Sequence, residues 1–364
     1  MKKKIYINGY FTKEHINGVP RYASEIVKRL DRYFEDEEVV LCVPKDAPNI
    51  PVLRNIKVCT WEERGKKHEM NNVLWGNITY KNYVKNKGIN VNLTNRAENI
   101  QGSITAIHDL ISLTKFQYGF KLSIKDQLKT AFYYIKNKLW FIYKVSVKKN
   151  TASAIVTVSE FSKQQICKKL NIDEAMVHVI GDGWEHINNI QEFDEKKDER
   201  ISPQSYFFFI GNVNPHKNMK WILNEAKNMP EELFVIAGKI PPNIKESIPD
   251  AVNNIIFLGY ISDGYMKFLM RNSKALLFPS LVEGFGIPPL EQLALKGKAI
   301  VADIPVMHEI FKDSVYYVDP YKSDYDLNQI LKAEISNGKD VLKENSWELS
   351  AEKWYKLIEK YRQE

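Results

Sequence analysis

The chain has 364 residues, of which 44% are hydrophobic and 27% are charged, and its formal net charge is +7. This length indicates two domains, and the hydrophobic content is sufficient for two globular cores. No uninterrupted apolar stretch approaches the roughly 20 residues of a membrane span, which excludes a transmembrane helix and leaves only the membrane surface. The modest positive charge is compatible with nucleic acid, anionic lipid or phosphorylated substrates as binding partners and does not distinguish among them.

The three cysteines, Cys42, Cys59 and Cys167, are scattered and form no Cys-x-x-Cys pair. This pattern indicates reduced, buried thiols in a cytosolic protein. The N-terminus is basic but no long apolar run follows it, so residues 1–9 predict a first strand and not a signal peptide. We therefore expect a cytoplasmic protein, peripheral on the inner face of the cell membrane if it works at a membrane.

Short apolar segments alternate with helical segments in the first half of the chain, which predicts a parallel, doubly wound α/β sheet. Strands are expected at residues 5–9, 39–43, 91–95, 103–109 and 154–159, and helices from residue 18 to about residue 32 and from residue 159. Ligands bind such sheets at the carboxyl ends of the strands. We therefore expect the loop of residues 8–21 and the His108–Asp109 pair to face a cleft. A plain helix start near Pro20 and a structural histidine are the simpler interpretations.

Residues 115–149 combine nine lysines and nine aromatic residues with a single acid, Asp126. At helical spacing they would form a basic, aromatic-rich face. One interpretation is contact with an anionic membrane near a lipid-linked acceptor. The other is a domain helix with its apolar residues inward and its lysines in water. Nucleic acid is not expected as a partner, because no motif of an RNA-binding or zinc module occurs.

Residues 188–205 are polar and highly charged, which is typical of a linker. The strand and helix alternation then resumes, with strands expected at residues 206–210, 233–239, 255–261, 275–280, 298–302 and 315–318. A last helix should be capped by Ser346 and anchored by Trp347 and Trp354. The predicted organisation is an N-terminal domain at residues 1–190, a linker at 191–205, a C-terminal domain at 206–345 and a final helix at 346–364.

Two glycine-containing turns of the second domain connect a strand to a helix. In residues 211–218, Lys217 adds a full positive charge to the turn amides, an arrangement suited to phosphate. In residues 281–291, Gly284 and Gly286 can take positive φ, and the two prolines that follow suit a first helical turn. An ordinary strand-to-helix connection with a solvated lysine is the simpler interpretation.

Two carboxylates, Glu283 and Glu291, flank the second turn. Their oxygens accept hydrogen bonds, so a pair beside a phosphate pocket suits hydroxyl-rich groups such as ribose or hexose. The whole string at residues 278–291, Phe-Pro-Ser-x-x-Glu-Gly-Phe-Gly-x-Pro-x-x-Glu, resembles the donor-site signature of the family 4 retaining glycosyltransferases.

This resemblance extends from Gly18, where Gly-Val-Pro-Arg-Tyr is similar to the family's glycine-rich first loop, to the final helix. It implies a GT-B fold of two Rossmann-like domains facing across a cleft. The N-terminal domain would bind the acceptor and the C-terminal domain a nucleoside diphosphate sugar. The last helix would cross back to the first domain.

The resemblance also implies roles for individual residues. The catalytic candidates are His108, facing the transferred sugar, Glu283, holding its hydroxyls, and Lys217, binding the diphosphate. Asn212 stands where the family often has an arginine, so Lys217 should carry more of the diphosphate charge. The donor-binding candidates are Gly211, Asn212, Lys217, Gly238, Lys239, Tyr260, Ile261, Glu283, Gly284, Phe285, Gly286, Ile287 and Glu291, the last on the ribose. The acceptor-binding candidates are Gly18, Val19, Arg21 and Asp109.

The implied reaction is transfer of a hexose to a hydroxyl of a glycan or lipid-linked acceptor with retention at the anomeric carbon. We expect attack on the same face, with the departing phosphate as the base. No Asp-x-Asp signature stands at a strand end, so neither a metal nor another cofactor is expected. The signature is frequent among mannosyl-type enzymes of surface polysaccharide synthesis, which favours GDP-mannose over UDP-glucose, UDP-N-acetylhexosamines and dTDP-rhamnose. A GT-B nucleotide-sugar epimerase or hydrolase and a non-catalytic nucleotide-sugar binding subunit are the alternatives.

Overall fold

The computed structural model describes residues 3–34, 38–62, 74–96, 98–114, 124–195, 198–211, 214–239 and 253–363, and in the helix that begins at residue 124 it describes side chains from residue 135 on. The chain divides into two units. Unit 1 comprises Met1–Leu113, Phe132–Gly183 and Ser346–Glu364. Unit 2 comprises Thr114–Ala131 and Trp184–Asn345.

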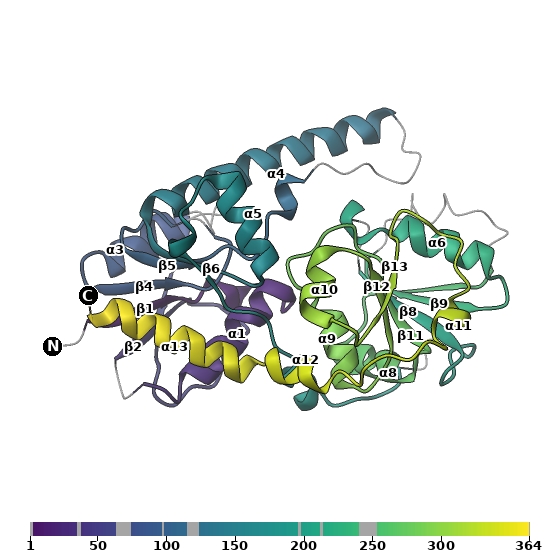
Figure 1. The fold of residues 1–364 in the computed structure, drawn as a ribbon. Coiled ribbons are helices and arrows are strands. Elements are labelled where there is room, and N and C mark those ends of the chain that lie inside the picture. Colours follow the sequence, from purple (N-terminus) through teal and green to yellow (C-terminus); the bar gives the residue numbers. More distant parts are fainter. Residues whose placement is uncertain are drawn as a thin grey trace. The chain divides into compact units, whose positions relative to one another are not determined.

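The described strands of unit 1 form a seven-stranded parallel sheet in the order β3-β2-β1-β4-β5-β6-β7 (Figure 1). They are β1 (Lys4–Asn8), β2 (Val39–Pro44), β3 (Lys57–Trp61), β4 (Gly88–Asn92), β5 (Ser103–Ala106), β6 (Ala152–Thr157) and β7 (Val177–Val179). The chain proceeds from β1 outward to β3 and then returns to the other side of β1 with β4. The strand order therefore reverses between β1 and β4, the position at which doubly wound sheets bind ligands.

Helices cover both faces of this sheet, with α1 and α13 on one face and α3, α4 and α5 on the other (Figure 1). The described helices of unit 1 are α1 (Gly18–Leu30), α3 (Lys81–Val84), α5 (Glu160–Leu170), α13 (Trp347–Gln363) and, from Phe132 on, α4 (Ile124–Thr151). Short turns are η1 (Tyr10–Lys13), η2 (Trp75–Tyr80), η3 (Ile111–Leu113) and η4 (Glu174–Met176). Ser159 caps α5, because its side chain accepts the Ser162 N–H at 3.1 Å. Phe141 and Val145 of α4 pack with Ile155 and Ile166 in a buried cluster.

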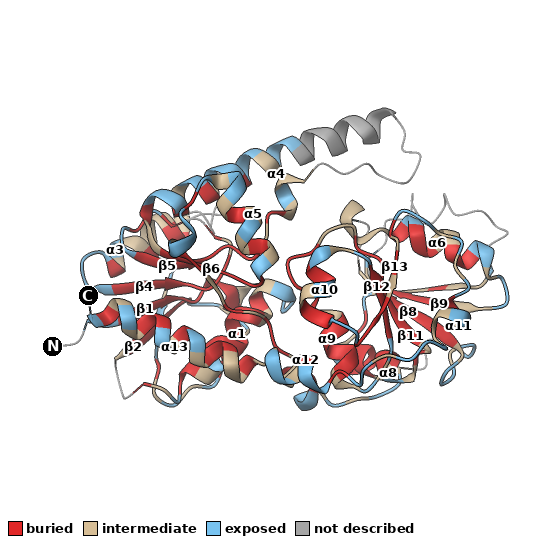
Figure 2. Ribbon diagram, in the orientation of Figure 1, coloured by how far each residue is buried: buried red, intermediate tan, exposed pale blue. Residues whose placement is uncertain are grey.

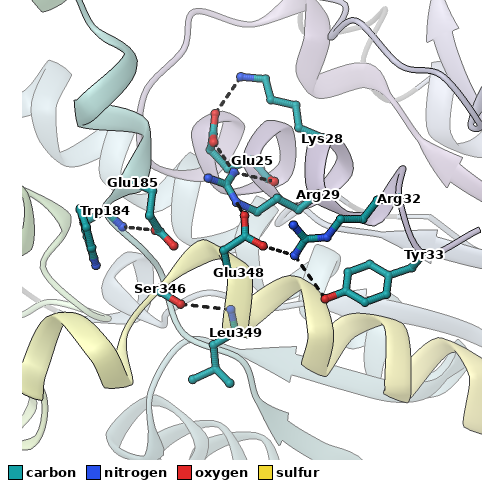
Figure 3. Close-up of polar contacts among 10 residues, drawn as sticks. All are labelled: Glu25, Lys28, Arg29, Arg32, Tyr33, Trp184, Glu185, Ser346, Glu348 and Leu349. Atoms are coloured by element: carbon teal, nitrogen blue, oxygen red, sulfur yellow. Dashed lines mark hydrogen bonds and ion pairs between the residues drawn. The ribbon is translucent and has the colours of Figure 1, made fainter.

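The final helix α13 packs against α1 within unit 1. Trp347 and Trp354, the two expected anchors, are fully buried. The Trp354 indole N–H donates to the Tyr22 hydroxyl at 2.7 Å. On the surface, Glu348 pairs with Arg29 and Arg32, which both lie on the α1 side of this contact (Figure 3).

The described strands of unit 2 form a six-stranded parallel sheet in the order β10-β9-β8-β11-β12-β13. They are β8 (Tyr206–Ile210), β9 (Leu233–Ala237), β10 (Ile255–Gly259), β11 (Ala275–Phe278), β12 (Ala299–Ala302) and β13 (Tyr316–Val318). In both units the buried residues concentrate on the strands (Figure 2). The order reverses between β8 and β11, so the predicted doubly wound architecture is confirmed twice.

After Gly183, the described helices of unit 2 are η5 (Glu185–Asn189), η6 (Pro215–Lys217), α6 (Met219–Asn228), α8 (Asp263–Asn272), α9 (Ile287–Ala294), α10 (Pro305–Phe311), α11 (Leu327–Ile330) and α12 (Lys339–Glu344). The core includes Phe207 and Phe209 of β8, packed with Trp221 and Ile222 of α6. The continuous apolar run of β8 is buried because helices cover both sides of a parallel sheet.

The segment predicted as a linker is not one. Its charged residues contact α8 and the residue that caps it: Glu192 pairs with Arg271 at 3.0 Å, and Glu195 accepts hydrogen bonds from Ser262. Trp184 donates its indole N–H to the Leu342 carbonyl at 2.9 Å. The main segment of unit 2 therefore starts at Trp184, so the predicted first-domain boundary at residue 190 is also wrong.

Two further observations concern thiols and membrane spans. Cys42, Cys59 and Cys167 are free, but only Cys42 is buried and the other two are half-buried, so the prediction of buried thiols is wrong for them. In the described part of the chain, no helix combines the length and the apolar character needed to cross a membrane.

The approach of α13 to the segment after β7 gives a test of the packing in unit 1. A Cβ atom on Gly183 would lie 2.0 Å from the backbone nitrogen of Trp347. Gly183→Ala should therefore displace the start of α13 and lower the free energy of unfolding by about 1–3 kcal/mol, measured as a lower melting temperature by circular dichroism. Gly18→Ala is the control, because no atom lies within 4 Å of its added methyl group. Equal melting temperatures for the two variants would contradict this packing.

Candidate active site

An ion pair spans the point in unit 2 where the strand order reverses. Lys217 lies in the loop after β8 and Glu283 in the loop after β11, and the Lys217 Nζ is 2.6 Å from the Glu283 Oε1. The ammonium also lies 4.9 Å from the centre of the Phe278 ring. The structure therefore brings together two of the three predicted catalytic residues, at the strand reversal where the fold predicts a ligand.

Backbone contacts fix these two loops against each other. The Leu281 N–H donates to the His216 carbonyl at 2.8 Å. Asn218, in the left-handed region at φ +56°, donates its side-chain amide to the Pro279 carbonyl at 3.0 Å. Burial lowers the pKa of the His216 imidazole to about 4, so this ring, which interacts electrostatically with Glu283, is neutral at neutral pH.

The turn before α9 forms as the sequence predicts, with one exception. Gly286 takes φ +115°, and a Cβ there would come 3.1 Å from the Met307 side chain. Prolines occupy the first turn of α9. Gly284 does not take positive φ. Phe285 has a buried side chain, so only its backbone is suited to a ligand. Ile287 begins α9 and is half-buried.

Glycines also join the ends of β8, β9 and β10. A Cβ on Gly238 would lie 1.8 Å from the Gly211 carbonyl oxygen, and Gly238 has φ +127°. Its N–H donates to the Gly259 carbonyl at 2.8 Å. Only glycine fits there, because a side chain would separate the strand ends. Of the remaining donor candidates, Lys239 and Tyr260 are exposed, Ile261 is buried, and Asn212 lies outside the described residues.

The second glutamate of the signature has a partner that the sequence analysis missed. The Nε2 of His186, on η5, lies 2.6 Å from the Glu291 Oε1, and the side chains are 3% and 5% exposed. This buried contact holds the Glu291 carboxylate beside the start of α9. Its signal in the sequence is weak, because 105 positions separate the two residues.

The predicted site residues of unit 1 form a separate group. His108 is buried, its Nε2 lies 3.0 Å from the Leu93 carbonyl oxygen, and its ring packs edge to face with Tyr22 at 4.7 Å. Burial lowers the pKa of the His108 imidazole to about 4. The neutral ring therefore donates its Nε2–H to Leu93 and presents Nδ1 as the acceptor. Asp109 accepts the Ile111 N–H at 2.9 Å.

The other acceptor candidates lie at the start of α1. Gly18 is exposed, and Val19 and Arg21 are half-buried. The Arg21 N–H donates to the Asn17 carbonyl at 2.7 Å, which closes the first turn. Among the described residues, no group of three or more His, Cys, Asp or Glu side chains could hold a metal ion.

The buried His186–Glu291 pair predicts a large stability effect. His186→Ala leaves a buried carboxylate without this partner and should lower the free energy of unfolding by roughly 3 kcal/mol, seen in thermal denaturation. His308→Ala is the matched control, since His308 forms an exposed 2.7 Å pair with Asp303 in the same unit. That control should lose at most about 1 kcal/mol. Equal losses of unfolding free energy in the two variants would show that the buried pair contributes no more to stability than the exposed pair.

The C-terminal part of the chain is similar to a known protein family. Residues 190–354 match the family described as Glycosyl transferases group 1. The chain is 32% identical over 186 residues to the O-antigen chain mannosyltransferase RfbU of Salmonella typhimurium, a match that covers 50% of each protein. It is 23% identical over 367 residues to O-antigen chain mannosyltransferase B of Escherichia coli, covering 92% of this chain and 89% of that protein.

Solved structures resemble the whole chain. Sucrose-phosphate synthase from Thermosynechococcus elongatus superimposes with a TM-score of 0.69 at 13% identity, covering 99% of both chains. WaaG, described as a glycosyltransferase involved in lipopolysaccharide biosynthesis, gives 0.62 at 12% identity over 98% of both chains. At these identities the similarity concerns the fold. Residues 190–354 are thus similar to the group 1 glycosyl transferases, and the chain as a whole has the GT-B fold.

Proposed function

We propose that this protein is a retaining glycosyltransferase that moves a hexose from a nucleoside diphosphate sugar to a hydroxyl of a glycan or lipid-linked acceptor in surface polysaccharide synthesis. The observation that carries the proposal is the Lys217–Glu283 pair between the β8 and β11 loops. The group 1 match over unit 2 supports the reaction class. The names of the two O-antigen mannosyltransferase relatives support a role in surface polysaccharide synthesis and favour GDP-mannose as the donor.

The donor diphosphate would bind at Lys217 and at the first turn of α9. Pro288 and Pro289 have no N–H, and the Leu290 N–H donates to the Gly286 carbonyl, so the first turn of α9 offers the Ile287 N–H and a partial positive charge. Lys217 adds a full charge. In a sugar nucleotide the hexose is joined to the β-phosphate through one oxygen. A phosphate at Lys217 therefore brings the sugar ring to Glu283, since the two side chains are 2.6 Å apart.

The ribose would bind at Glu291. Its carboxylate accepts hydroxyl hydrogens, and His186 fixes its orientation. Gly211 and Gly238 hold the ends of β8 and β9 close together, because a Cβ on Gly238 would meet the Gly211 carbonyl oxygen. Tyr260, exposed after β10, is then a candidate contact for the base.

The difficult step is departure of the nucleoside diphosphate while positive charge grows on the sugar. Charged and polar groups that are already in place usually contribute most to such catalysis. Lys217 and the positive end of α9 would stabilise the leaving diphosphate without a metal ion, and Glu283 would favour the growing positive charge. His108, being neutral, would serve as a hydrogen-bond partner of the hexose and not as an acid. The acceptor would attack on the face that the phosphate leaves, with that phosphate taking the proton.

Contact with an anionic membrane through α4 is a further part of this proposal. Phe141 and Val145 are buried, as expected for an ordinary domain helix. Among the side chains of α4 that the structure describes, from residue 135 on, five other large apolar residues remain exposed, with Ile135 and Leu139 at 55% and 62%: Ile135, Leu139, Trp140, Ile142 and Tyr143. Lysines 136 and 138 lie beside them, which suits anionic lipid. Residues 115–123, also part of the predicted membrane segment, lie outside the described residues.

Separate effects of the two signature glutamates test the donor site. Glu291→Ala should weaken nucleotide binding, seen as a smaller rise in melting temperature when nucleoside diphosphates and their sugars are added. Glu283→Ala should instead lower kcat by at least about a hundredfold with little change in nucleotide binding, because it acts on the sugar.

The same assay separates the alternatives. Release of free sugar or an isomerised donor without acceptor would favour a hydrolase or an epimerase, and binding without turnover would favour a non-catalytic subunit. Activity lost to EDTA and restored by manganese would contradict the metal-free mechanism. Wild-type turnover in both glutamate variants would remove the proposed roles.

Vesicle binding tests the membrane contact. Leu139→Glu/Ile142→Glu should reduce cosedimentation with phosphatidylglycerol vesicles by about tenfold, because it places two acids on the exposed apolar face of α4. Val52→Glu is the matched control, since Val52 is 96% exposed outside that helix. Equal binding by both variants, or equal binding of the wild type to neutral phosphatidylcholine vesicles, would contradict docking on anionic lipid.

A further inference from the structure

We propose that Arg96 and Lys144 form an anion-binding subsite at the strand reversal of unit 1, which takes the phosphate or carboxylate oxygens of the acceptor. This inference rests on the proposed function for its biological ligand. The subsite itself rests on the geometry of unit 1 alone.

Arg96 lies at the strand reversal of unit 1, where a doubly wound sheet binds ligands. The strand order reverses between β1 and β4, and Glu14 follows β1 whereas Arg96 follows β4. The two side chains form an ion pair. Unit 2 has the same arrangement, since Lys217 follows β8 and Glu283 follows β11. Each unit therefore has an ion pair across its own reversal point, with the acid and the cation exchanged between the strands.

The unsatisfied donors of Arg96 are the second observation. Arg96 is only 9% exposed, its guanidinium lies 4.3 Å from the centre of the Tyr10 ring, and its Nη2 pairs with Glu14. Its Nε and Nη1 have no hydrogen-bond partner within the part of the chain that the structure describes. A buried charged donor without an acceptor is costly, so a ligand that supplies strong acceptors stabilises this arrangement.

A second cation joins the guanidinium. Desolvation lowers the pKa of the Lys144 ammonium on α4, and repulsion from Arg96 adds to the effect, whereas Asp109 and Glu14 oppose it. An anion between the two cations would relieve this repulsion. A neutral hydroxyl would not, so we infer anionic oxygens as the ligand class.

The loop that carries Arg96 also fixes His108. The Leu93 carbonyl accepts from the His108 ring, and the Asn95 side chain accepts the His108 N–H at 2.9 Å. Lys148 donates to the Thr94 carbonyl at 2.6 Å and holds the same loop. The subsite is thus built next to the proposed sugar contact, where an acceptor that carries a phosphate or a carboxylate would be held by that group.

Binding of small anions tests the subsite without turnover. Methyl phosphate and glucuronate are titrated calorimetrically, at low salt, into a Lys217→Gln background that weakens phosphate binding to unit 2. Adding Arg96→Gln should weaken binding by about tenfold or more, since charge-assisted hydrogen bonds are lost. Adding Lys144→Gln should weaken it severalfold. Lys168→Gln, which removes an exposed lysine elsewhere in unit 1, should have no effect.

The outcomes are distinct. Binding of methyl phosphate alone assigns the subsite to a phosphorylated acceptor, and binding of glucuronate alone to an acidic sugar. The proposal is overturned if neither anion binds, or if Arg96→Gln and Lys144→Gln bind as the background does. Lys144 is half-buried on a helix, so its variant keeps the test valid even if Arg96→Gln fails to fold. Failure of sugar nucleotides to bind the wild type would defeat the proposed function but leave the subsite standing.

Discussion

The ion pair between Lys217 and Glu283 is the interaction on which the proposed function depends. It exists because two parallel strands that are far apart in the sequence, β8 and β11, are neighbours in the sheet. Their following loops start from the same edge and run toward each other. The Leu281–His216 and Asn218–Pro279 hydrogen bonds then hold the two loops at a fixed separation. A cation for a diphosphate and an acid for a sugar are thus adjacent before any substrate binds, which is the form of preorganisation that electrostatic catalysis requires.

Unit 1 uses the same topology with different chemistry. Its reversal point carries Arg96 and Glu14, and a buried polar network supports the loop after β4. Lys148 donates to two backbone carbonyls, Thr94 and Ala106, and burial raises the pKa of Glu98 to about 8. Glu98 is therefore largely protonated at neutral pH and acts as a hydrogen-bonding group among asparagines, with Asn90 as one donor at 3.2 Å. These hydrogen bonds hold the loop after β4 in place.

The local sequence pattern predicted most strands of the two sheets and much of the donor site. The apolar run of residues 206–210 predicted β8 with the correct bounds, and the Gly-x-Pro spacing predicted the turn before α9. Strand β3 was missed because Lys57–Trp61 is an edge strand with mostly exposed residues and no clear alternation. The charged segment before residue 206 was misread as a linker, because composition does not reveal that Glu192 and Glu195 have partners at α8.

Contacts between distant segments account for the remaining omissions. His186 meets Glu291, and Arg96 meets Glu14, only after the sheets have formed, and no local motif marks either residue. The resemblance to a known family indicated which residues bind the donor, but it did not indicate what holds them in place. Those supporting residues follow from packing, because a buried polar atom needs a hydrogen-bond partner and the folded chain supplies it from a distant segment.

A crystal structure with a bound sugar nucleotide is the most direct test of the central claim. We predict diphosphate oxygens within hydrogen-bond distance of the Lys217 ammonium and the first turn of α9, ribose hydroxyls on Glu291, and the hexose against Glu283. A nucleotide bound elsewhere, with the Lys217–Glu283 pair intact and out of reach of the phosphates, would contradict this claim.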